Sequence, residues 1–560
     1  MSSNLLPVVS PKALVSGTPE FEAARTSLLD EFGAKVPPEL RLPKELIAHP
    51  PKNVTHIPRE CGLLSADEVA ITEHYDATDL AAAIASQKYT AVAVARAFAK
   101  RAIIAHQLTC CLSEWFMDEA VAQAQALDHH LASTGTTVGP LHGVPISVKE
   151  HMPLAGHWSS VGFLDTRVRD AADCQMMAIL RAAGAVFYCK TNQPQSIMHL
   201  ETTSALWGRA LNPHNVGLSA GGSTGGEAAL VAMRGSVLGV GTDIGGSVRG
   251  PAGFCGIFGF KATSYTLPQD DFIAGGAAAE LNVLCSAGPM CTSLRDMDLF
   301  MTVMAAAKPY LSDPRLVPIP WTGLRGGGAT PAPLRIGFMM GDGVILPQPP
   351  VLKALEWAKA KLTGAAAADG FSVTTFTPYK VAEAMKNIRK AYYPDGGKTV
   401  KAHLAATGEP MLPLTQWIIK DAEGPDVTSA GVLEQRLTRD KFRGDFAKHW
   451  TAQDVDVVVC PVFVGPACEH ESAFYWNYTA FWNYVDCPGV VIPTPIRAGK
   501  RGSEAYASAD ALGEQDKHVR ELWAKGDFEG APVNIQIVAR KYHDNELFAA
   551  LARMKSALEM

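Results

Sequence analysis

The sequence SAGGSTGGEAALVAMRGSVLGVGTDIGGSVR, residues 219–249, organises the interpretation of the whole chain. Its glycines fall in three tight clusters; Ser223 lies in the first and Ser247 ends the last. Between them, residues 227–233 favour a short helix and residues 237–241 a buried strand. Such glycines allow backbone N–H groups to approach another group closely, beside a serine hydroxyl. The stretch therefore offers the nucleophile and the oxyanion donors that acyl chemistry requires.

Two serines compete for the role of nucleophile. Residues 221–225, GGSTG, match the G-x-S-x-G elbow of α/β-hydrolases, which would make Ser223 the nucleophile. That elbow requires a strand directly before the serine, whereas residues 212–217 have the composition of a loop. Ser247 has a predicted strand upstream and is the better candidate. A phosphate-binding loop is excluded because no Gly-Lys-Ser/Thr follows either glycine cluster.

A base must lie elsewhere in the chain. Lys149 ends a predicted apolar strand, residues 144–148, and is followed by Glu150. One interpretation is a salt bridge to Glu150 or an exposed strand end; the other is a neutral, buried lysine that serves as base. Lowering a lysine pKa to about 7–8 costs roughly 4 kcal/mol, which burial can impose. A Ser–His arrangement also stays open, because this third of the chain contains His142, His151, His157, His199 and His214.

Helix signals dominate the first part of the chain. Residues 1–75 are proline-rich and irregular in pattern, which predicts an arm lying over the main body. Three helices are expected after it, forming a helical layer. They are residues 78–85 with Thr78 or Asp79 as cap, residues 90–107 with Thr90 as cap, and residues 118–130 with Asp118 as cap.

Helices and strands then alternate, which predicts an α/β protein with a layered sheet. A helix over residues 173–183 ends at Gly184, and Pro251 suits the first turn of another helix. Residues 324–334 have linker composition and residues 499–517 that of an exposed loop. The remaining expected strands are residues 186–190, 257–261, 457–460, 490–492 and 533–538, and residues 545–558 form the expected last helix.

Composition excludes several classes of protein. The 560-residue chain is 47% hydrophobic and 19% charged, with a net charge of −6, which argues against nucleic-acid binding. Its 11 cysteines show neither CxxC pairs nor metal-ligand spacing, so we expect free thiols, no metal and a reducing compartment. We see no signal peptide and no apolar run long enough to span a membrane. These features predict a cytoplasmic protein.

Three motifs in order resemble the amidase signature family. They are GVPISVKE at residues 143–150, GGSTGGEAAL at 221–230 and GTDIGGSVRGPAGFCGIFGFKAT at 241–263. The segment from Glu60 is similar to the fungal acetamidase-like branch, and the resemblance spans roughly residues 55–555. It implies an α/β fold with a large mixed central sheet covered by helices on both faces, together with the N-terminal helical layer. The expected division is an arm, residues 1–75, and one domain, 76–555, with a catalytic core at about 140–300 and a second lobe at about 335–555.

The same resemblance implies roles for individual residues. Ser247 would be the nucleophile, Ser223 a bridging serine after a cis peptide bond, and Lys149 the neutral general base. Asp243 and Arg249 are interpreted as a structural pair that braces the loop. The implied oxyanion donors are the backbone N–H groups of Ile244, Gly245, Gly246 and Ser247, and the candidate substrate contacts are Gly221, Gly222, Thr224 and Trp482.

The implied activity is hydrolysis of a small-molecule carboxamide to a carboxylate and ammonia or an amine, through an acyl-enzyme and without a cofactor. We expect no nucleic-acid or membrane partner, with a homodimer as a candidate assembly. Two alternatives remain: a partner-dependent, glutaminase-type amidotransferase subunit, and an α/β-hydrolase-type esterase that uses Ser223. The aromatic residues within 474–484 are either a packed core wall or one side of the acyl pocket.

Overall fold

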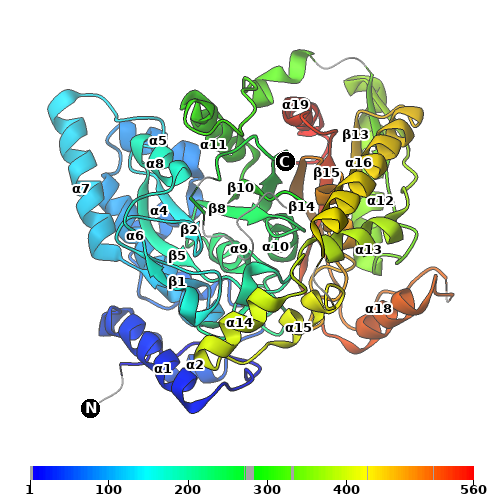
Figure 1. Cartoon of the computed structure of the whole chain (residues 1–560). Coiled ribbons are helices and arrows are strands. Elements are labelled where there is room, and N and C mark those ends of the chain that lie inside the picture. The colour runs from blue at the N-terminus through cyan, green and yellow to red at the C-terminus, as the bar shows by residue number, and fades with distance from the viewer. Residues whose placement is uncertain (1–3, 270, 273–282, 330–332, 425–426, 509) are drawn as a thin grey trace.

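The computed structural model describes residues 4–269, 271–272, 283–329, 333–424, 427–508 and 510–560 (Figure 1). Its centre is a sheet that has eleven strands in the described part of the chain. In spatial order the strands are β1 (Leu112–Trp115), β5 (Val186–Thr191), β2 (Pro145–Lys149), β8 (Leu238–Asp243), β10 (Ser286–Cys291), β9 (Phe258–Lys261), β14 (Gly489–Arg497), β15 (Pro532–Val538), β13 (Val457–Pro461), β11 (Leu334–Phe338) and β12 (Phe371–Thr375).

The strands of this sheet run in mixed directions. Strands β5, β2 and β8 are parallel to one another, as are β13, β11 and β12 near the other edge. The strands between them are antiparallel. Val148 of β2 pairs with Val240 of β8, so the carboxyl ends of these two strands meet at one edge. That register places Lys149 beside the residues that end β8.

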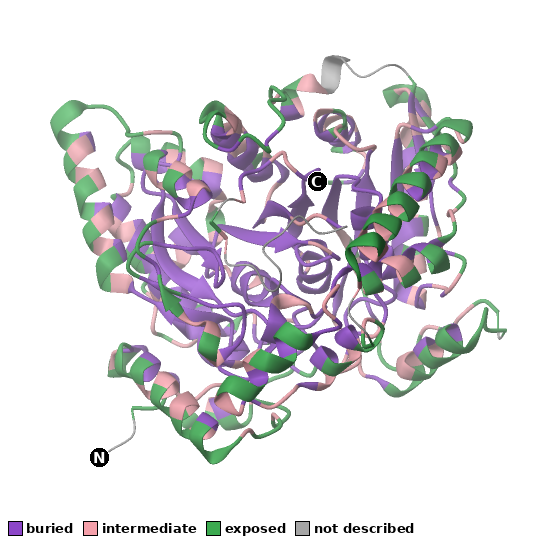
Figure 2. Ribbon diagram, viewed as in Figure 1, coloured by how far each residue is buried: buried purple, intermediate pink, exposed green. Residues whose placement is uncertain are grey.

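Helices cover both faces of the sheet, which confirms the predicted α/β architecture (Figure 1). One group packs on the strands and on one another: α6 (Ala91–Thr109), α9 (Gly225–Ala232) and α10 (Arg249–Cys255). Further helices pack on the sheet or border it: α8 (Gln175–Ala182), α11 (Leu294–Ala306), α12 (Pro349–Asp369) and α19 (Asp544–Met554). The buried residues concentrate in the sheet and in α9 and α10 (Figure 2).

The helical layer is present, with corrected start points. Thr90 caps α6 as predicted, because its side chain accepts from the Ala93 amide at 3.0 Å. Helix α5 (Ala77–Ala85) is capped by Asp76 and not by Thr78 or Asp79, which lie inside its first turn. Helix α7 (Met117–Thr134) begins before Asp118, after Phe116, which gives no side-chain cap. Asp79 in α5 and Asp118 in α7 lie in the first turn of their helices, where an acidic residue is easily taken for an N-cap from sequence alone.

Residues 4–75 are only partly irregular. They contain α1 (Pro19–Ala34), α2 (Lys44–Ala48), α3 (Ile57–Glu60) and α4 (Ala66–His74). Ser65 and Glu68 form a capping box at the start of α4, a signal that is present in the sequence. The segment lies on the main body, since the Val9 amide donates to the Gln107 carbonyl at 2.9 Å.

Two predicted loops also contain helices. In the predicted linker, a 3-10 helix at Gly323–Ala329 packs on α19, and residues 330–332 lie outside the described residues. The predicted exposed loop ends early, because α18 (Glu514–Lys525) begins within it. The second half adds α13 (Val381–Ala391), α14 (Lys398–Thr407), α15 (Pro413–Lys420), α16 (Ser429–Ala452) and α17 (Asn477–Tyr484). None of the helices in the described ranges is long and apolar enough to cross a membrane.

Candidate active site

Lys149 is a fully buried lysine at the carboxyl end of β2. Its Nζ lies 2.6 Å from Ser223 Oγ, 3.0 Å from Thr224 Oγ1 and 3.3 Å from Thr242 Oγ1. Burial lowers the pKa of Lys149 to about 7, because removal from water disfavours the ammonium form. The side chain is therefore available as a neutral amine near neutral pH.

Glu150 is not the partner of Lys149. The Ser160 hydroxyl donates to its Oε1 at 2.6 Å, and the Trp207 indole N–H donates to the same oxygen at 3.3 Å. Burial raises the pKa of Glu150 above its usual value. The salt-bridge interpretation of the Lys149-Glu150 pair is thus wrong, since the two side chains bond to different groups.

Ser223 follows a cis peptide bond from Gly222, as the resemblance implied. The chain before it is loop and not strand, so the elbow geometry is absent at this serine. The flanking glycines are required by close packing: a Cβ at Gly221 would lie 2.7 Å from Pro251 Cα, and one at Gly222 would lie 2.6 Å from the Glu201 backbone. Both glycines face protein atoms, which explains their presence without a contact to substrate.

Ser247 lies in the turn between β8 and α10, and it is 7% exposed. The amide of Thr224 donates to the Ser247 carbonyl at 3.1 Å. This bond joins the two glycine-rich loops, so the fold brings Ser247, Ser223 and Lys149 into one region.

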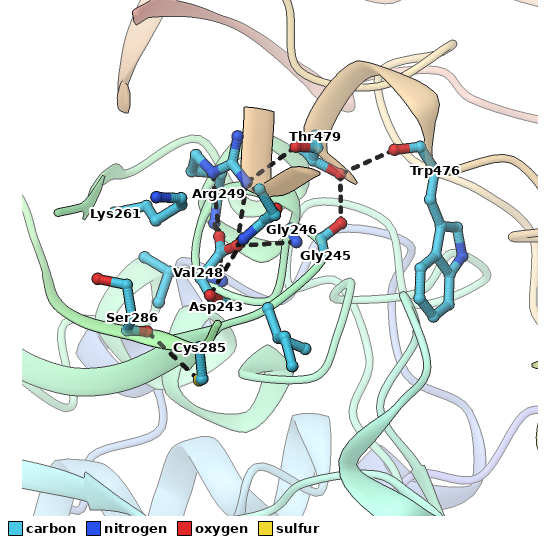
Figure 3. A network of polar contacts seen from close by, with 12 residues as sticks. Asp243, Gly245, Gly246, Val248, Arg249, Lys261, Cys285, Ser286, Trp476 and Thr479 are labelled. Carbon is cyan, nitrogen blue, oxygen red and sulfur yellow. Dashed lines mark hydrogen bonds and ion pairs between the residues drawn. The ribbon is translucent and has the colours of Figure 1, made fainter. Parts of the chain in front are cut away.

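Asp243 braces the turn that carries Ser247 (Figure 3). Its carboxylate accepts from the amides of Gly246 at 2.9 Å and Val248 at 3.1 Å, and from the Arg249 guanidinium at 3.0 Å. Burial alone would raise the pKa of Asp243, but the adjacent Arg249 guanidinium holds it well below its usual range. The pair is fully buried, as a structural brace would be.

Two carbonyl groups of the same turn accept hydrogen bonds from side chains in the second half of the chain. Tyr392 Oη donates to the Ile244 carbonyl at 2.9 Å. Thr479 Oγ1 donates to the Gly245 carbonyl at 2.7 Å (Figure 3). Within one peptide the C=O and the following N–H point in opposite directions. These bonds therefore set the directions of the Gly245 and Gly246 amides. The Gly246 amide is directed to Asp243, so it already has an acceptor within the turn.

Only glycine fits at Gly245 and Gly246. A Cβ at Gly245 would lie 2.6 Å from Tyr392 Oη, and one at Gly246 would lie 2.2 Å from Thr479 Oγ1. Gly246 also has a φ of +128°, which side chains rarely adopt. Tyr392 and Thr479 were missed at the level of sequence, because no motif links them to a turn more than a hundred residues away.

Trp482, a predicted substrate contact, is packed among aromatic residues of the core. It is fully buried in α17, with ring centroids 6.2 Å from Phe446 and 6.1 Å from Trp450 of α16. Within the stretch 474–484, Trp476 lies near the turn: a Cβ at Gly245 would lie 3.4 Å from its ring. Phe481, Trp482 and Tyr484 of this stretch therefore form a packed wall against α16. Phe474 and Trp476 pack instead against Trp417 of α15.

The five candidate histidines are hydrogen-bonded to groups other than the two serines. His142 Nδ1 accepts from the Val138 amide, and His214 Nε2 lies 3.2 Å from the Cys255 carbonyl. His151 bonds to Gln193 and Thr242, His157 to Glu114, and His199 to Thr415. The described residues contain no group of three or more His, Cys, Asp or Glu that could hold a metal ion, and the cysteines are free thiols.

Comparison with known proteins gives a consistent result. The family profile described as Amidase matches residues 93–548. An amidase of Gibberella zeae is 36% identical over 90% of this chain and 93% of its own length. An acetamidase of Emericella nidulans is 35% identical over 89% of this chain and 91% of its own.

Solved structures show the same fold. A fatty acid amide hydrolase superposes with a TM-score of 0.88 at 32% identity, covering 97% of this chain and 95% of that one. A bacterial aryl acylamidase, 20% identical and with a TM-score of 0.68, covers 86% of this chain and 96% of its own. At that identity the second match speaks for the fold alone.

Proposed function

Because the chain belongs to the amidase family, and is therefore an amide-hydrolysing enzyme, we propose that it cleaves a carboxamide C–N bond with Ser247, Ser223 and Lys149. Ser247 Oγ attacks the carbonyl carbon and forms an acyl-enzyme. Its proton passes to Ser223, and the Ser223 proton passes to Lys149. The protonated relay then supplies the proton with which ammonia or an amine leaves, and water releases the carboxylate by the reverse sequence.

The observation that carries this proposal is the state of Lys149. A fully buried lysine whose pKa is lowered to about 7 is a base matched to neutral pH. It lies 2.6 Å from Ser223 Oγ, within the reach that proton transfer requires. Ser223 in turn is tied to Ser247 through the Thr224 amide.

Charge that develops on the carbonyl oxygen needs donors in the turn after β8. We propose the backbone amides of Ile244, Gly245 and Ser247 for this role. Gly246, also a predicted donor, would contribute only if its bond to Asp243 were released. A missing oxyanion donor typically slows catalysis about 100- to 1,000-fold, so the direction of these amides matters.

The substrate is a small-molecule amide, and its size is part of the proposal. Relatives are named acetamidase and a structural neighbour is a fatty acid amide hydrolase, so short aliphatic to long-chain amides define the range of substrates to test.

Residues 76–555 act as one catalytic domain under an arm of residues 1–75, in the cytoplasm and without a cofactor. The eleven-stranded central sheet, which includes both β1 and β15, supports that division. A homodimer is the proposed assembly.

Two other functions are less well supported. An esterase that uses Ser223 with a histidine lacks the required strand before Ser223, and the candidate histidines bond elsewhere. A glutaminase-type subunit would need a partner for activity. Activity of the purified single chain would exclude that dependence.

The test is release of ammonia or amine by the purified chain from a series that runs from acetamide to long-chain and aryl amides. Ser247→Ala and Lys149→Ala should each lose activity by at least about a thousandfold. Ser472→Ala is the matched control, because that hydroxyl bonds to the Glu469 carbonyl in another loop. Full activity of Ser247→Ala would reject the proposal.

A further inference from the structure

A chain of hydrogen bonds leads from Ser160 to Lys149 and fixes the direction of each donor. The Gln193 amide nitrogen donates to the Ser160 carbonyl at 2.8 Å, so Gln193 Oε1 faces the other way, toward His151. His151 Nδ1 lies 2.9 Å from that oxygen. Because an amide oxygen only accepts, His151 Nδ1 carries the hydrogen. All three residues are buried.

The tautomer of His151 then determines what Thr242 does. In a neutral imidazole with hydrogen on Nδ1, Nε2 is an acceptor. Thr242 Oγ1 lies 3.4 Å from His151 Nε2, so the Thr242 hydroxyl hydrogen is directed to that nitrogen. The oxygen lone pairs of Thr242 are left for Lys149 Nζ, 3.3 Å away.

Thr224 presents Lys149 with a second acceptor. Its hydroxyl donates to the Thr242 carbonyl at 3.4 Å, and its oxygen lies 3.0 Å from Lys149 Nζ. A neutral amine has two N–H groups and one lone pair. With the two N–H groups directed to Thr224 and Thr242, the lone pair is left for the third neighbour, Ser223 Oγ.

We propose that His151 is a positioning residue: through Thr242 it keeps the N–H groups of neutral Lys149 away from Ser223, so that the amine lone pair faces the Ser223 hydroxyl. This inference rests on the proposed function, since it concerns the same base. His151 itself touches neither the serines nor the reacting atoms. His151 affects how the N–H groups and the lone pair of Lys149 are oriented. This orientation matters because an amine whose lone pair already accepts another hydrogen bond cannot accept the Ser223 proton.

Removing the ring nitrogens of His151 should reverse the direction of the hydrogen bond between Thr242 and Lys149. The His151 ring contacts Phe272 edge to face, with 5.8 Å between the ring centroids. A phenylalanine at position 151 keeps this contact, but Thr242 loses its hydrogen-bond acceptor. The Thr242 hydroxyl is then free to donate to the Lys149 lone pair. That bond favours the neutral amine and competes with Ser223, so reactivity falls and the pKa of Lys149 falls with it.

The experiment measures the rate constant for labelling of Ser247 by a fluorophosphonate probe as a function of pH, on the full-length protein. We expect His151→Phe to label about tenfold more slowly at the high-pH plateau, with its midpoint about half a unit lower. His151→Gln offers an acceptor oxygen to Thr242 and should recover most of the rate. His106→Phe, which removes a buried neutral histidine elsewhere, is the matched control and should match the wild type.

The other groups that act on the two side chains stay constant in these variants. Near Lys149 they are Cys285, Asp243 and Glu227, and near His151 they are Lys149 and Lys190. Should His151→Phe fail to fold, as judged by circular dichroism, Gln193→Leu tests the same chain one step away and should slow labelling several-fold.

The outcomes separate this inference from the proposed function. If the wild type is not labelled on Ser247, the proposed function fails and the inference fails with it. If the wild type is labelled and folded His151→Phe shows the same rate and midpoint, only the role of His151 is overturned. A slower rate with an unchanged midpoint and no recovery in His151→Gln would mark a structural role and would also overturn it.

Discussion

Tyr392 Oη donates a hydrogen bond of 2.9 Å to the carbonyl oxygen of Ile244, across 148 residues of sequence. Tyr392 follows α13 in the second half of the chain, whereas Ile244 follows β8. The bond directs the next amide, that of Gly245, to the opposite side of the peptide. The second half of the chain thus orients a proposed oxyanion donor without contacting the substrate.

Tyr392→Phe should therefore lower kcat while KM changes little. The variant keeps the ring and removes only the hydroxyl that holds the Ile244 carbonyl, so the Gly245 amide loses its fixed direction. We expect a loss of about tenfold, smaller than the loss of a whole oxyanion donor. Steady-state kinetics on the best amide measures it. Tyr393→Phe, at the adjacent buried tyrosine, is the control; an equal loss there would show that any tyrosine in this region is needed only for packing.

Activity should rise with pH through about neutrality. The active form is neutral Lys149, whose pKa burial lowers to about 7, so the neutral fraction grows as pH increases through that value. At about pH 5 the rate should be roughly one-hundredth of its plateau. A pH profile of kcat/KM with stability checked at each pH measures this. A flat profile over that range would show that Lys149 does not act as the base.

Asp243→Asn should destabilise the protein strongly. It leaves the fully buried guanidinium of Arg249 without its counter-ion, a change that typically costs about 3–5 kcal/mol in the free energy of unfolding. Urea unfolding measures it. Asp445→Asn, at an exposed pair with Lys441, is the matched control and should leave the midpoint nearly unchanged. Equal midpoints for wild type and Asp243→Asn would contradict the bracing role.

Low pH should weaken the Asp243–Arg249 pair and thereby lower the stability of the folded protein. The pKa of Asp243 in the folded protein is held below its unfolded value, so its contribution to stability is present above the unfolded pKa and is lost as pH falls through the folded one. The wild type should therefore lose more stability than Asp243→Asn between about pH 4 and the acid limit of folding. Parallel losses would show that Asp243 does not contribute to acid sensitivity.

Trp482→Ala separates a core residue from a pocket residue. Its ring is packed against Phe446 and Trp450, so the substitution should cost about 3–5 kcal/mol of stability. KM for amides of different length should change uniformly or not at all at temperatures where the variant is folded. A selective increase in KM for aromatic or long amides would instead return Trp482 to the substrate pocket.

The sequence was informative where chemistry is local. The motifs around Lys149, Ser223 and Ser247 are each short and continuous, and strands β2, β5 and β8 could be placed from apolar runs next to them. The mixed sheet was implied by the family resemblance, since no local pattern shows which strands pair. The catalytic roles themselves stay predictions until they are measured.

Long-range contacts explain what was missed. Tyr392 and Thr479 hydrogen-bond to partners that their own neighbours in sequence do not reveal. The substrate contact of Trp482 stays a prediction, because an aromatic run has the same composition in a core wall and in a pocket. The capping box of Ser65 and Glu68 is a local signal in the sequence, and it marks the start of helix α4 in the N-terminal arm.

The most direct test of the central claim is peptide mass spectrometry of the purified protein after treatment with a fluorophosphonate probe. We expect a single phosphonyl adduct on Ser247, absent in Ser247→Ala and strongly reduced in Lys149→Ala. An adduct on Ser223 of the wild-type protein, with Ser247 unmodified, would contradict it.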